Sequence, residues 1–168
     1  MKMKFCAVLV ALGVVAAPAA ALAASAQLKA ADGADIGTLS LVQTAKGVRI
    51  SGTLRGLTPG IHAFHIHETG KCEPPFKSAG GHFNPGGVPH GKHAEGGPHA
   101  GDMENLFVVD SGPYELKAVN DKVTLSTAVK HSVFDADGSA IVIHAEADDY
   151  KSQPSGAAGP RVACGVIH

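Results

Sequence analysis

The spacing of apolar residues along the chain predicts a structure built from short β-strands. Leu39 and Leu41 stand two residues apart, as in a strand that buries one face. Val48 and Ile50 repeat this spacing, and Lys46-Gly47 between the two pairs is typical of a hairpin turn. Strands are expected within residues 26–57 and at 61–67, 106–110, 114–119, 122–129, 139–144 and 162–167.

Turn-forming residues separate these segments at regular intervals, which favours an all-β fold. About eight short strands of this kind predict an antiparallel sandwich or barrel. After residue 23, helical periodicity does not extend beyond about two turns. Two long stretches, the one that follows His67 and residues 145–160, are expected to be functional loops on a single domain.

The segment from His62 to Asp102 concentrates the chemistry of the chain. It holds seven of the ten histidines, and eight glycines fall between Gly80 and Gly101. A disordered histidine-rich tract is one interpretation of such a composition. The distinct histidine spacings, with Phe64 and other apolar residues beside them, favour an ordered metal site instead.

His65 and His67 are expected to project from the same face of a strand, because alternate strand residues share a face. Two imidazoles so placed can chelate one ion, and four would suit Cu(II), which favours tetragonal nitrogen coordination. His144 ends another apolar strand and joins this pair only if the strands are neighbours. Three histidines and one carboxylate make a tetrahedral zinc set, which the loop offers as His82, His90, His99 and Asp102.

The first 23 residues have the features of a cleaved secretory signal peptide. Lys2 and Lys4 precede an apolar run that ends in small residues, with cleavage expected after Ala23 or Ala26. Cleavage after Ala23 leaves one domain, residues 24–168, with no membrane anchor. Losing the two lysines takes the net charge from −1 to −3, which does not indicate a nucleic-acid partner.

Cleavage also changes what the cysteines imply. Cys6 leaves with the signal peptide, and Cys72 and Cys164 remain as a pair in an oxidising compartment. One disulfide is the expected arrangement, and two free buried thiols are the alternative.

Five motifs follow one another along the chain: Phe64-His-Ile-His67, Gly81-His-Phe-Asn-Pro85, His99-Ala-Gly-Asp102, His144-Ala-Glu-Ala-Asp-Asp149 and Arg161-Val-Ala-Cys-Gly-Val-Ile167. With these motifs the chain resembles the secreted bacterial copper/zinc superoxide dismutases from about residue 35 to residue 167, nearly the whole chain after the signal peptide. That family has a Greek-key β-sandwich, which the resemblance implies here.

The resemblance implies one copper ion and one zinc ion per chain, with His82 shared between them. Asp148 would tie a copper ligand to a zinc ligand, Arg161 would stand at the mouth of the copper site, and Cys72 would pair with Cys164. The implied copper ligands are His65, His67, His82 and His144, and the implied zinc ligands are His82, His90, His99 and Asp102.

The implied activity is periplasmic dismutation of superoxide to oxygen and hydrogen peroxide by alternating reduction and oxidation of the copper, with a structural zinc. Relatives occur as monomers and as homodimers, and the sequence does not decide between them. The loop between His144 and Arg161 is short, with Lys151 as its one basic residue, so its part in steering substrate stays open.

Two other functions use the same residues differently. A periplasmic copper or zinc carrier uses all the metal ligands, but it does not need Arg161, Asp148 or the sharing of His82 between two ions. An adhesive sandwich leaves the ordered ligand types unexplained. The remaining histidines are expected to be packed or exposed and not to bind metal: His62, His93, His131 and His168.

Overall fold

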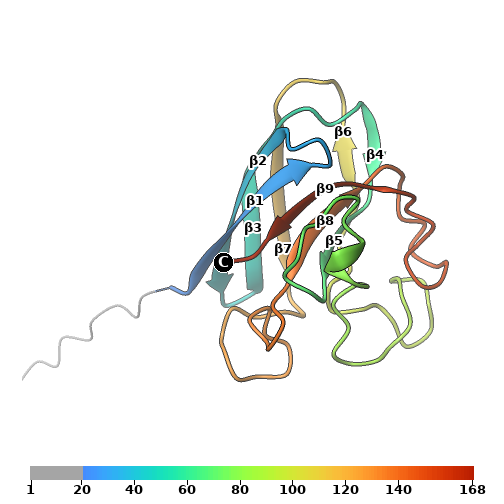
Figure 1. The fold of residues 1–168 in the computed structure, drawn as a ribbon. Helices are drawn as coiled ribbons and strands as arrows, with labels where there is room; N and C mark the ends of the chain where they lie inside the picture. Colours follow the sequence, from blue (N-terminus) through green and yellow to red (C-terminus); the bar gives the residue numbers. More distant parts are fainter. Residues whose placement is uncertain (1–20) are drawn as a thin grey trace, which may run out of the picture.

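The computed structural model describes residues 21–168, which form an antiparallel sheet curled into a half-barrel (Figure 1). Seven strands pair in the order β5-β8-β9-β1-β2-β3-β7, and β4 pairs with β6. The strands are β1 (Ala23–Ala30), β2 (Asp35–Thr44), β3 (Gly47–Leu54), β4 (Gly60–His62), β5 (Phe64–His67), β6 (Leu106–Val108), β7 (Tyr114–Asn120), β8 (Ala140–His144) and β9 (Arg161–Val166). A short 3₁₀ turn, η1, spans Lys77–Ala79.

The hairpin between β2 and β3 forms as the alternation predicts. Leu39, Leu41, Val48 and Ile50 are fully buried in the barrel core. The chain turns between Thr44 and Gly47, where backbone φ of the glycine is +113° and a side chain would collide with β7. Glycine therefore satisfies both the turn and the close approach of strands.

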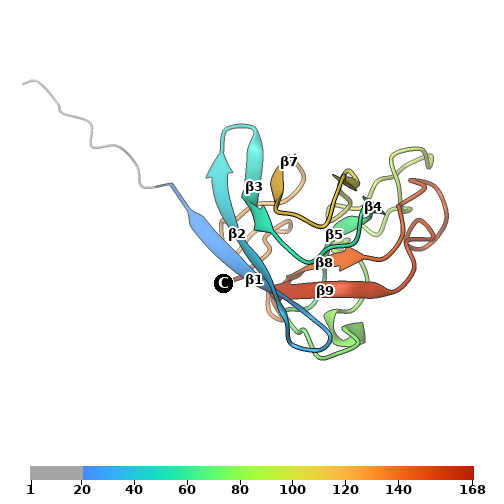
Figure 2. The same cartoon turned by 90° about the horizontal axis from the view of Figure 1, so that it is seen from above.

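The strand order is that of a Greek-key fold, because consecutive strands are not always neighbours. β3 pairs with β7 and not with β4, and β5 pairs with β8, far away in the sequence. Figure 2, seen from above, shows β5, β8 and β9 side by side along one wall. This topology confirms the expected all-β class and places two histidine-bearing strands next to each other.

Two expected strands differ in the structure. Residues 61–67 are divided at Ala63 into β4 and β5, so the segment serves both sheets. The strand expected at 122–129 is wrong: this segment is irregular, with bends and one isolated bridge between Thr124 and Ser132. The Gln43 side chain accepts hydrogen bonds from the Thr124 hydroxyl and the Leu125 amide, so these groups are satisfied without a strand ladder.

Two apolar clusters hold the domain together. The larger one fills the half-barrel and includes Phe64 and Ile66 of β5. The smaller one lies outside β8 and β9, where the loop that carries η1 packs against them: Phe76, Ala79, Ala140, Val142, Cys164 and, partly buried, Cys72.

The expected signal peptide falls almost wholly outside the described residues, and only positions 21–23 of it are described. In the described part of the chain, 21–168, there is no helix of the length and hydrophobicity that a membrane crossing requires.

Candidate metal centre

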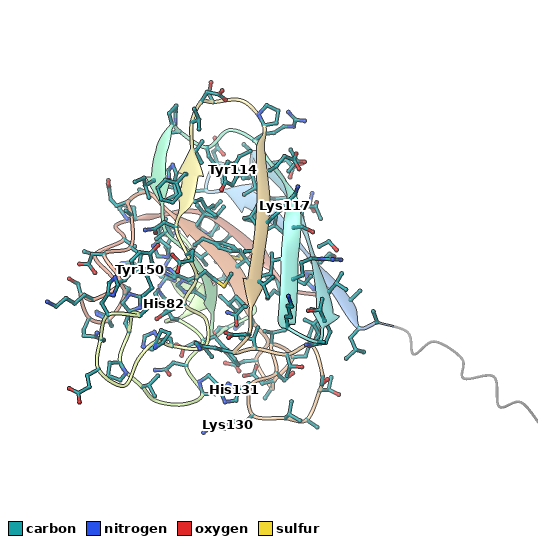
Figure 3. All side chains as sticks on the ribbon, turned by 180° about the vertical axis from the view of Figure 1, so that it is seen from behind. His82, Tyr114, Lys117, Lys130, His131 and Tyr150 are labelled. Carbon is teal, nitrogen blue, oxygen red and sulfur yellow. A yellow bond between two sulfur atoms is a disulfide. The ribbon has the colours of Figure 1, made fainter. Side chains whose placement is uncertain are left out.

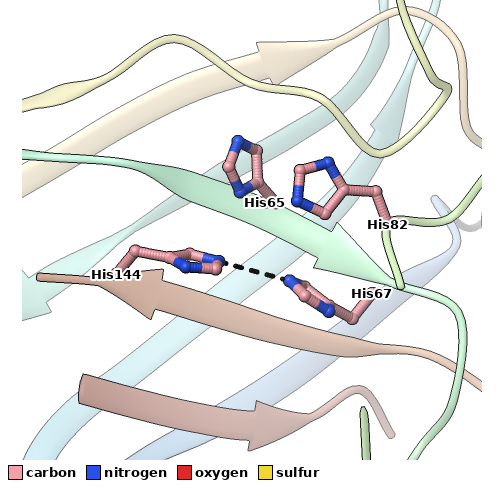
Figure 4. Close-up of side chains that lie close together, drawn as sticks. All are labelled: His65, His67, His82 and His144. Carbon is pink, nitrogen blue, oxygen red and sulfur yellow. Dashed lines mark hydrogen bonds between the residues drawn. The ribbon is translucent and has the colours of Figure 1, made fainter. Parts of the chain in front are cut away.

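Four histidines from two neighbouring strands and a loop converge on one point (Figure 4). His65 and His67 are alternate residues of β5, so Phe64 and Ile66 between and beside them enter the core while both imidazoles face the site. His144 ends β8, the antiparallel partner of β5. His82 follows from the long loop, and one nitrogen of each of the four rings lies within 4.8 Å of the others.

Hydrogen bonds fix which nitrogen each ring offers. Nδ1 of His67 lies 3.1 Å from the Gly80 carbonyl, and Nδ1 of His144 lies 3.3 Å from the Gly159 carbonyl. Because a carbonyl oxygen only accepts, both Nδ1 atoms carry the proton and both Nε2 atoms present lone pairs. These two Nε2 atoms face each other at 3.4 Å (Figure 4). Two lone pairs that face each other repel, and a cation bound by both nitrogens would remove that repulsion.

A second group adjoins the first and consists of His82, His90, His99 and Asp102. Nδ1 of His82 and of His90 lie 2.8 and 3.0 Å from the Asp102 carboxylate, and Nδ1 of His99 lies 3.3 Å from it. The backbone amides of Gly91 and His99 donate to Asp102 Oδ2 and hold the carboxylate in place. Three imidazole nitrogens and one carboxylate oxygen are the donor set of a tetrahedral zinc site.

Unsatisfied nitrogen atoms support both sites. Among residues 21–168, several buried ring nitrogens have no aligned hydrogen-bond partner. Buried polar atoms without partners are rare in proteins, so each calls for an explanation. All of these face one of the two groups, which fits metal coordination: Nδ1 of His65, Nε2 of His82, Nδ1 of His90 and Nδ1 of His99.

His82 belongs to both groups. Its Nδ1 faces the carboxylate of Asp102, and its Nε2 faces the rings of the four-histidine group, with the His65 ring centroid 3.9 Å away. Burial lowers the pKa of His82 to about 4, although the contact with Asp102 opposes that shift. The ring is therefore neutral at neutral pH, with one proton and one nitrogen lone pair, and it would have to release that proton to bind a cation at each nitrogen.

Asp148 connects the two groups from behind. Its Oδ2 accepts from Nε2 of His65 at 2.9 Å, and its Oδ1 accepts from Nε2 of His90 at 3.0 Å. Burial would raise the pKa of Asp148, but these hydrogen bonds hold it well below its usual range. The carboxylate thus turns the Nδ1 atom of each imidazole toward its own metal group.

A cavity of about 450 Å³ opens onto the four-histidine group and is lined by His82, His144 and Arg161, among others. Arg161 donates from Nη1 to the Phe76 carbonyl at 2.7 Å and from Nη2 to the Gly80 carbonyl at 2.6 Å. The loop that supplies both carbonyls is fastened to β9 by the Cys72–Cys164 disulfide, which confirms that expectation. Arg161 is therefore held at this opening by the fold.

Each residue that the sequence placed in a metal set lies in that set. His62 is buried between the carbonyls of Thr58 and His144, each 2.8 Å from a ring nitrogen. His93, His131 and His168 are exposed, as expected.

Sequence reasoning missed three residues around the centre. Glu68 lines the cavity and accepts from the Gly81 amide at 2.7 Å, and its position directly after His67 was a usable signal. The Asn105 side chain accepts a hydrogen bond from the Asp148 amide, and the Tyr150 amide donates to the Asp148 carboxylate. Nothing in the sequence pattern marks either residue.

Comparison with known proteins gives one consistent result. A family described as copper/zinc superoxide dismutase (SODC) matches residues 36–167. "Superoxide dismutase [Cu-Zn] 2" of Aquifex aeolicus is 50% identical over 148 residues, 87% of this chain and 86% of that protein. "Superoxide dismutase [Cu-Zn]" of Caulobacter vibrioides is 44% identical over 86% of this chain and 84% of its own length. The crystal structure of a SOD-like protein from Bacillus subtilis superposes with a TM-score of 0.81 at 38% identity, covering 84% of this chain and 96% of that one.

Proposed function

Because this chain belongs to the copper/zinc superoxide dismutase family, we propose that Arg161 and His82 are the catalytic side chains of its superoxide dismutation. The reaction consumes two superoxide anions and two protons and yields one dioxygen and one hydrogen peroxide. The copper site is formed by His65, His67, His82 and His144, and the zinc site by His82, His90, His99 and Asp102. Copper supplies the one-electron redox couple when bound, and zinc supplies fixed positive charge without redox chemistry.

The observation that carries the proposal is the place of Arg161. Its guanidinium lines the cavity that leads to His82 and His144, and two backbone carbonyls fix its orientation. A guanidinium offers a permanent charge and several donors to a small anion. Among the described residues that line this cavity, Arg161 is the one lysine or arginine. In a protein of net negative charge, that local positive field attracts superoxide to the copper side of the centre.

His82 is proposed to handle a proton at Nε2. Nδ1 of His82 points at the zinc group and Asp102, so Nε2 is the atom that faces the cavity side. A ring held at one nitrogen can take up and release a proton at the other without rotating. Nε2 of His82 thus offers one of the two protons that peroxide requires, close to where the anion is bound.

Asp148 is proposed to orient the ligands. Its two hydrogen bonds hold His65 of one site and His90 of the other in a single arrangement. Carboxylates in this position fix the tautomer and direction of metal-bound histidines. The role predicts that both sites lose affinity together when the carboxylate is removed.

A metal carrier on the same fold is the second candidate. It uses all the ligands, but it gives no reason for an arginine held by two hydrogen bonds at the opening. The two functions separate in one assay, the consumption of superoxide by the chain loaded with copper and zinc. A carrier binds both metals and adds no activity above that of free copper.

We also propose that residues 1–23 are a signal peptide and that the protein works in the periplasm. The Cys72–Cys164 disulfide supports an oxidising compartment. Cleavage after Ala23 keeps nearly all of β1, whereas cleavage after Ala26 removes a buried residue that pairs with Leu39 of β2. Mass spectrometry of the protein from the periplasmic fraction tests this. A chain that begins at Ala24 supports the proposal, and an intact Met1 in the cytoplasm contradicts it.

A homodimer is the last part of the proposal. Ile61 and Phe107 are opposite each other on β4 and β6, and their side chains are 44% and 63% exposed. Adjacent exposed apolar side chains are typical of association surfaces. Sedimentation equilibrium of the wild type and of Phe107→Lys tests the assembly. A dimer that the substitution dissociates supports it, and a wild-type monomer contradicts it.

A further inference from the structure

The Tyr150 hydroxyl lies where three parts of the chain meet. It accepts a hydrogen bond from the Asn105 amide at 2.9 Å and lies 3.1 Å from Glu104 Oε2, to which it donates. Tyr150 itself belongs to the loop that carries Asp148, whereas Glu104 and Asn105 lie two and three residues after the zinc ligand Asp102. One hydroxyl therefore joins the Asp148 loop to the segment that supplies a zinc ligand.

Lys92 adds the third segment, the loop between His90 and His99. Its Nζ donates to both oxygens of Glu104 at 2.7 Å and lies 4.0 Å from the centre of the Tyr150 ring. The backbone amide of His93 also donates to the Tyr150 carbonyl at 3.1 Å. The ring thus packs beneath a cation that is itself neutralised by Glu104.

The backbone around Tyr150 fixes the Asp148 carboxylate. The Tyr150 amide donates to Asp148 Oδ1 at 2.6 Å, the same oxygen that accepts from His90. The Asn105 side chain pairs with both the amide and the carbonyl of Asp148, at 2.9 Å each. Any shift of Tyr150 therefore changes the direction in which Asp148 holds His90 and His65.

The conformation of Tyr150 indicates that its side chain matters. Its φ is +61°, a left-handed conformation that favours glycine and costs other residues free energy. Glycine would relieve this strain, whereas every residue with a Cβ atom carries it. The contacts of the Tyr150 ring and hydroxyl offset that cost.

We infer that Tyr150 is a positioning residue for the zinc site. Through its hydroxyl and ring it holds the Lys92 loop, Glu104 and the Asp148 loop in one arrangement, and so raises zinc affinity. This inference rests on the proposed role of Asp148. Tyr150 is not among the residues that line the cavity beside Arg161, so it acts through other residues and not on the substrate.

Tyr150→Phe tests the inference because it removes the hydroxyl and keeps the ring. The chain supplies a matched control in its other tyrosine, Tyr114 of β7, which lies toward the opposite end of the molecule from His82 in Figure 3. Zinc dissociation constants of the metal-free wild type, Tyr150→Phe and Tyr114→Phe are measured by competition with a chromophoric chelator. Tyr150→Phe is expected to weaken zinc binding by about 3- to 10-fold, and Tyr114→Phe to leave it unchanged.

Cobalt(II) bound in the zinc site gives a second readout that stability alone does not move. Its visible absorption bands are expected to shift in Tyr150→Phe, because the direction of His90 changes, and to stay constant in Tyr114→Phe. A Tyr150→Phe protein with a lower melting temperature, but with wild-type zinc affinity and wild-type cobalt bands, overturns the inference.

Asp148→Asn separates this inference from the proposal beneath it. That variant is expected to weaken zinc binding by about 10- to 100-fold, the usual effect of losing a carboxylate behind a metal ligand. If Asp148→Asn weakens zinc and Tyr150→Phe does not, the inference about Tyr150 fails alone. If neither variant weakens zinc, the proposed role of Asp148 fails and the inference fails with it.

Discussion

Arg161 and His67 share one carbonyl group. Nη2 of Arg161 donates to the oxygen of Gly80 at 2.6 Å, and Nδ1 of His67 lies 3.1 Å from the same oxygen. The cationic side chain at the cavity and a copper ligand are thus oriented by a single peptide unit. That unit sits in the loop closed by the Cys72–Cys164 disulfide, so the geometry of the centre depends on a covalent link outside it.

Substitution of Arg161 is expected to slow turnover without removing copper. Arg161→Ala loses the charge and the donors, and kcat/KM should fall by about 10-fold or more, with a weaker dependence on salt. Arg161→Lys keeps the charge without the paired hydrogen bonds, so its kcat/KM should lie between those of the wild type and Arg161→Ala. Steady-state rates at several ionic strengths, with copper counted per chain, measure both effects. Arg49→Ala, on the exposed face of β3, is the control, and a full rate in Arg161→Ala contradicts the proposed role.

Removal of the disulfide is expected to lower both stability and activity. The bond joins residues 92 apart, and a loop of that length contributes about 4–5 kcal/mol in the chain-entropy model. Activity should fall as well, because the loop that holds Arg161 through Phe76 and Gly80 is no longer fastened. Thermal unfolding and turnover of Cys72→Ser/Cys164→Ser test this. Reductant should lower the melting temperature of the wild type and leave that of the double variant unchanged.

His82→Ala is expected to damage both metal sites at once. The residue contributes a nitrogen to each group, so the copper group keeps three ligands and the zinc group keeps three. Copper and zinc affinities should both fall, and superoxide consumption should be lost. His93→Ala removes an exposed imidazole from the same loop and should change neither. Zinc affinity at the wild-type level in His82→Ala would mean that this histidine is not shared.

Gly156→Ala is expected to disturb the hydrogen bond between Asp148 and His90. A methyl group at Gly156 would collide with the Asp148 carboxylate and lie 2.8 Å from His90 Nε2. Zinc affinity should fall by about 10-fold, as for other changes behind metal ligands.

Gly87→Ala separates this crowding from the backbone cost of alanine. The two glycines have φ of +63° and +69°, but Gly87 has open space around it. Gly87→Ala should therefore cost only about 1–2 kcal/mol of stability and keep its zinc affinity. Equal zinc affinities in the two variants contradict the account of Gly156.

Zinc binding is expected to release a proton from His90. Burial opposes protonation of this ring, but the carboxylates of Asp102 and Asp148 on its two sides raise its pKa to about 9 in the metal-free chain. Below that pH the ring is protonated, and zinc must displace the proton to bind Nδ1. Zinc affinity should therefore rise with pH and level off near the pKa.

Calorimetry in buffers of different ionisation enthalpy measures the release. At pH 7.5, about one proton should leave His90 for each zinc bound. His82, whose pKa is lowered to about 4 by burial, is already neutral there and contributes none. A zinc affinity that is constant between pH 7 and 9 contradicts the assignment.

The ligand sets were readable from the sequence because their local geometry is simple. His65 and His67 share a face by strand alternation alone, and the Leu39–Ile50 hairpin follows the same rule. What alternation cannot supply is which strands are neighbours. The pairing of β5 with β8, which brings His144 to the site, depends on Greek-key connections between distant segments.

Other features were unpredictable because they depend on side-chain contacts to the backbone. The Gln43 side chain accepts hydrogen bonds from the Thr124 hydroxyl and the Leu125 amide. The Leu125 amide therefore needs no partner strand, and the strand expected at 122–129 does not form. Tyr150 acts on Asp148 through one hydrogen bond and Asn105 acts on it through two, and no sequence periodicity marks either residue. Arg161 is held by the backbone carbonyls of Phe76 and Gly80. Every residue has a backbone carbonyl, so the residue types at these positions do not reveal this role.

The most direct measurement is superoxide consumption by the chain from Ala24 to His168, loaded with copper and zinc and with both metals counted by mass spectrometry. The account expects one copper and one zinc per chain, and a rate far above that of the same concentration of free copper. Both metals bound, with no rate above free copper, would contradict enzymatic turnover and identify the chain as a metal carrier.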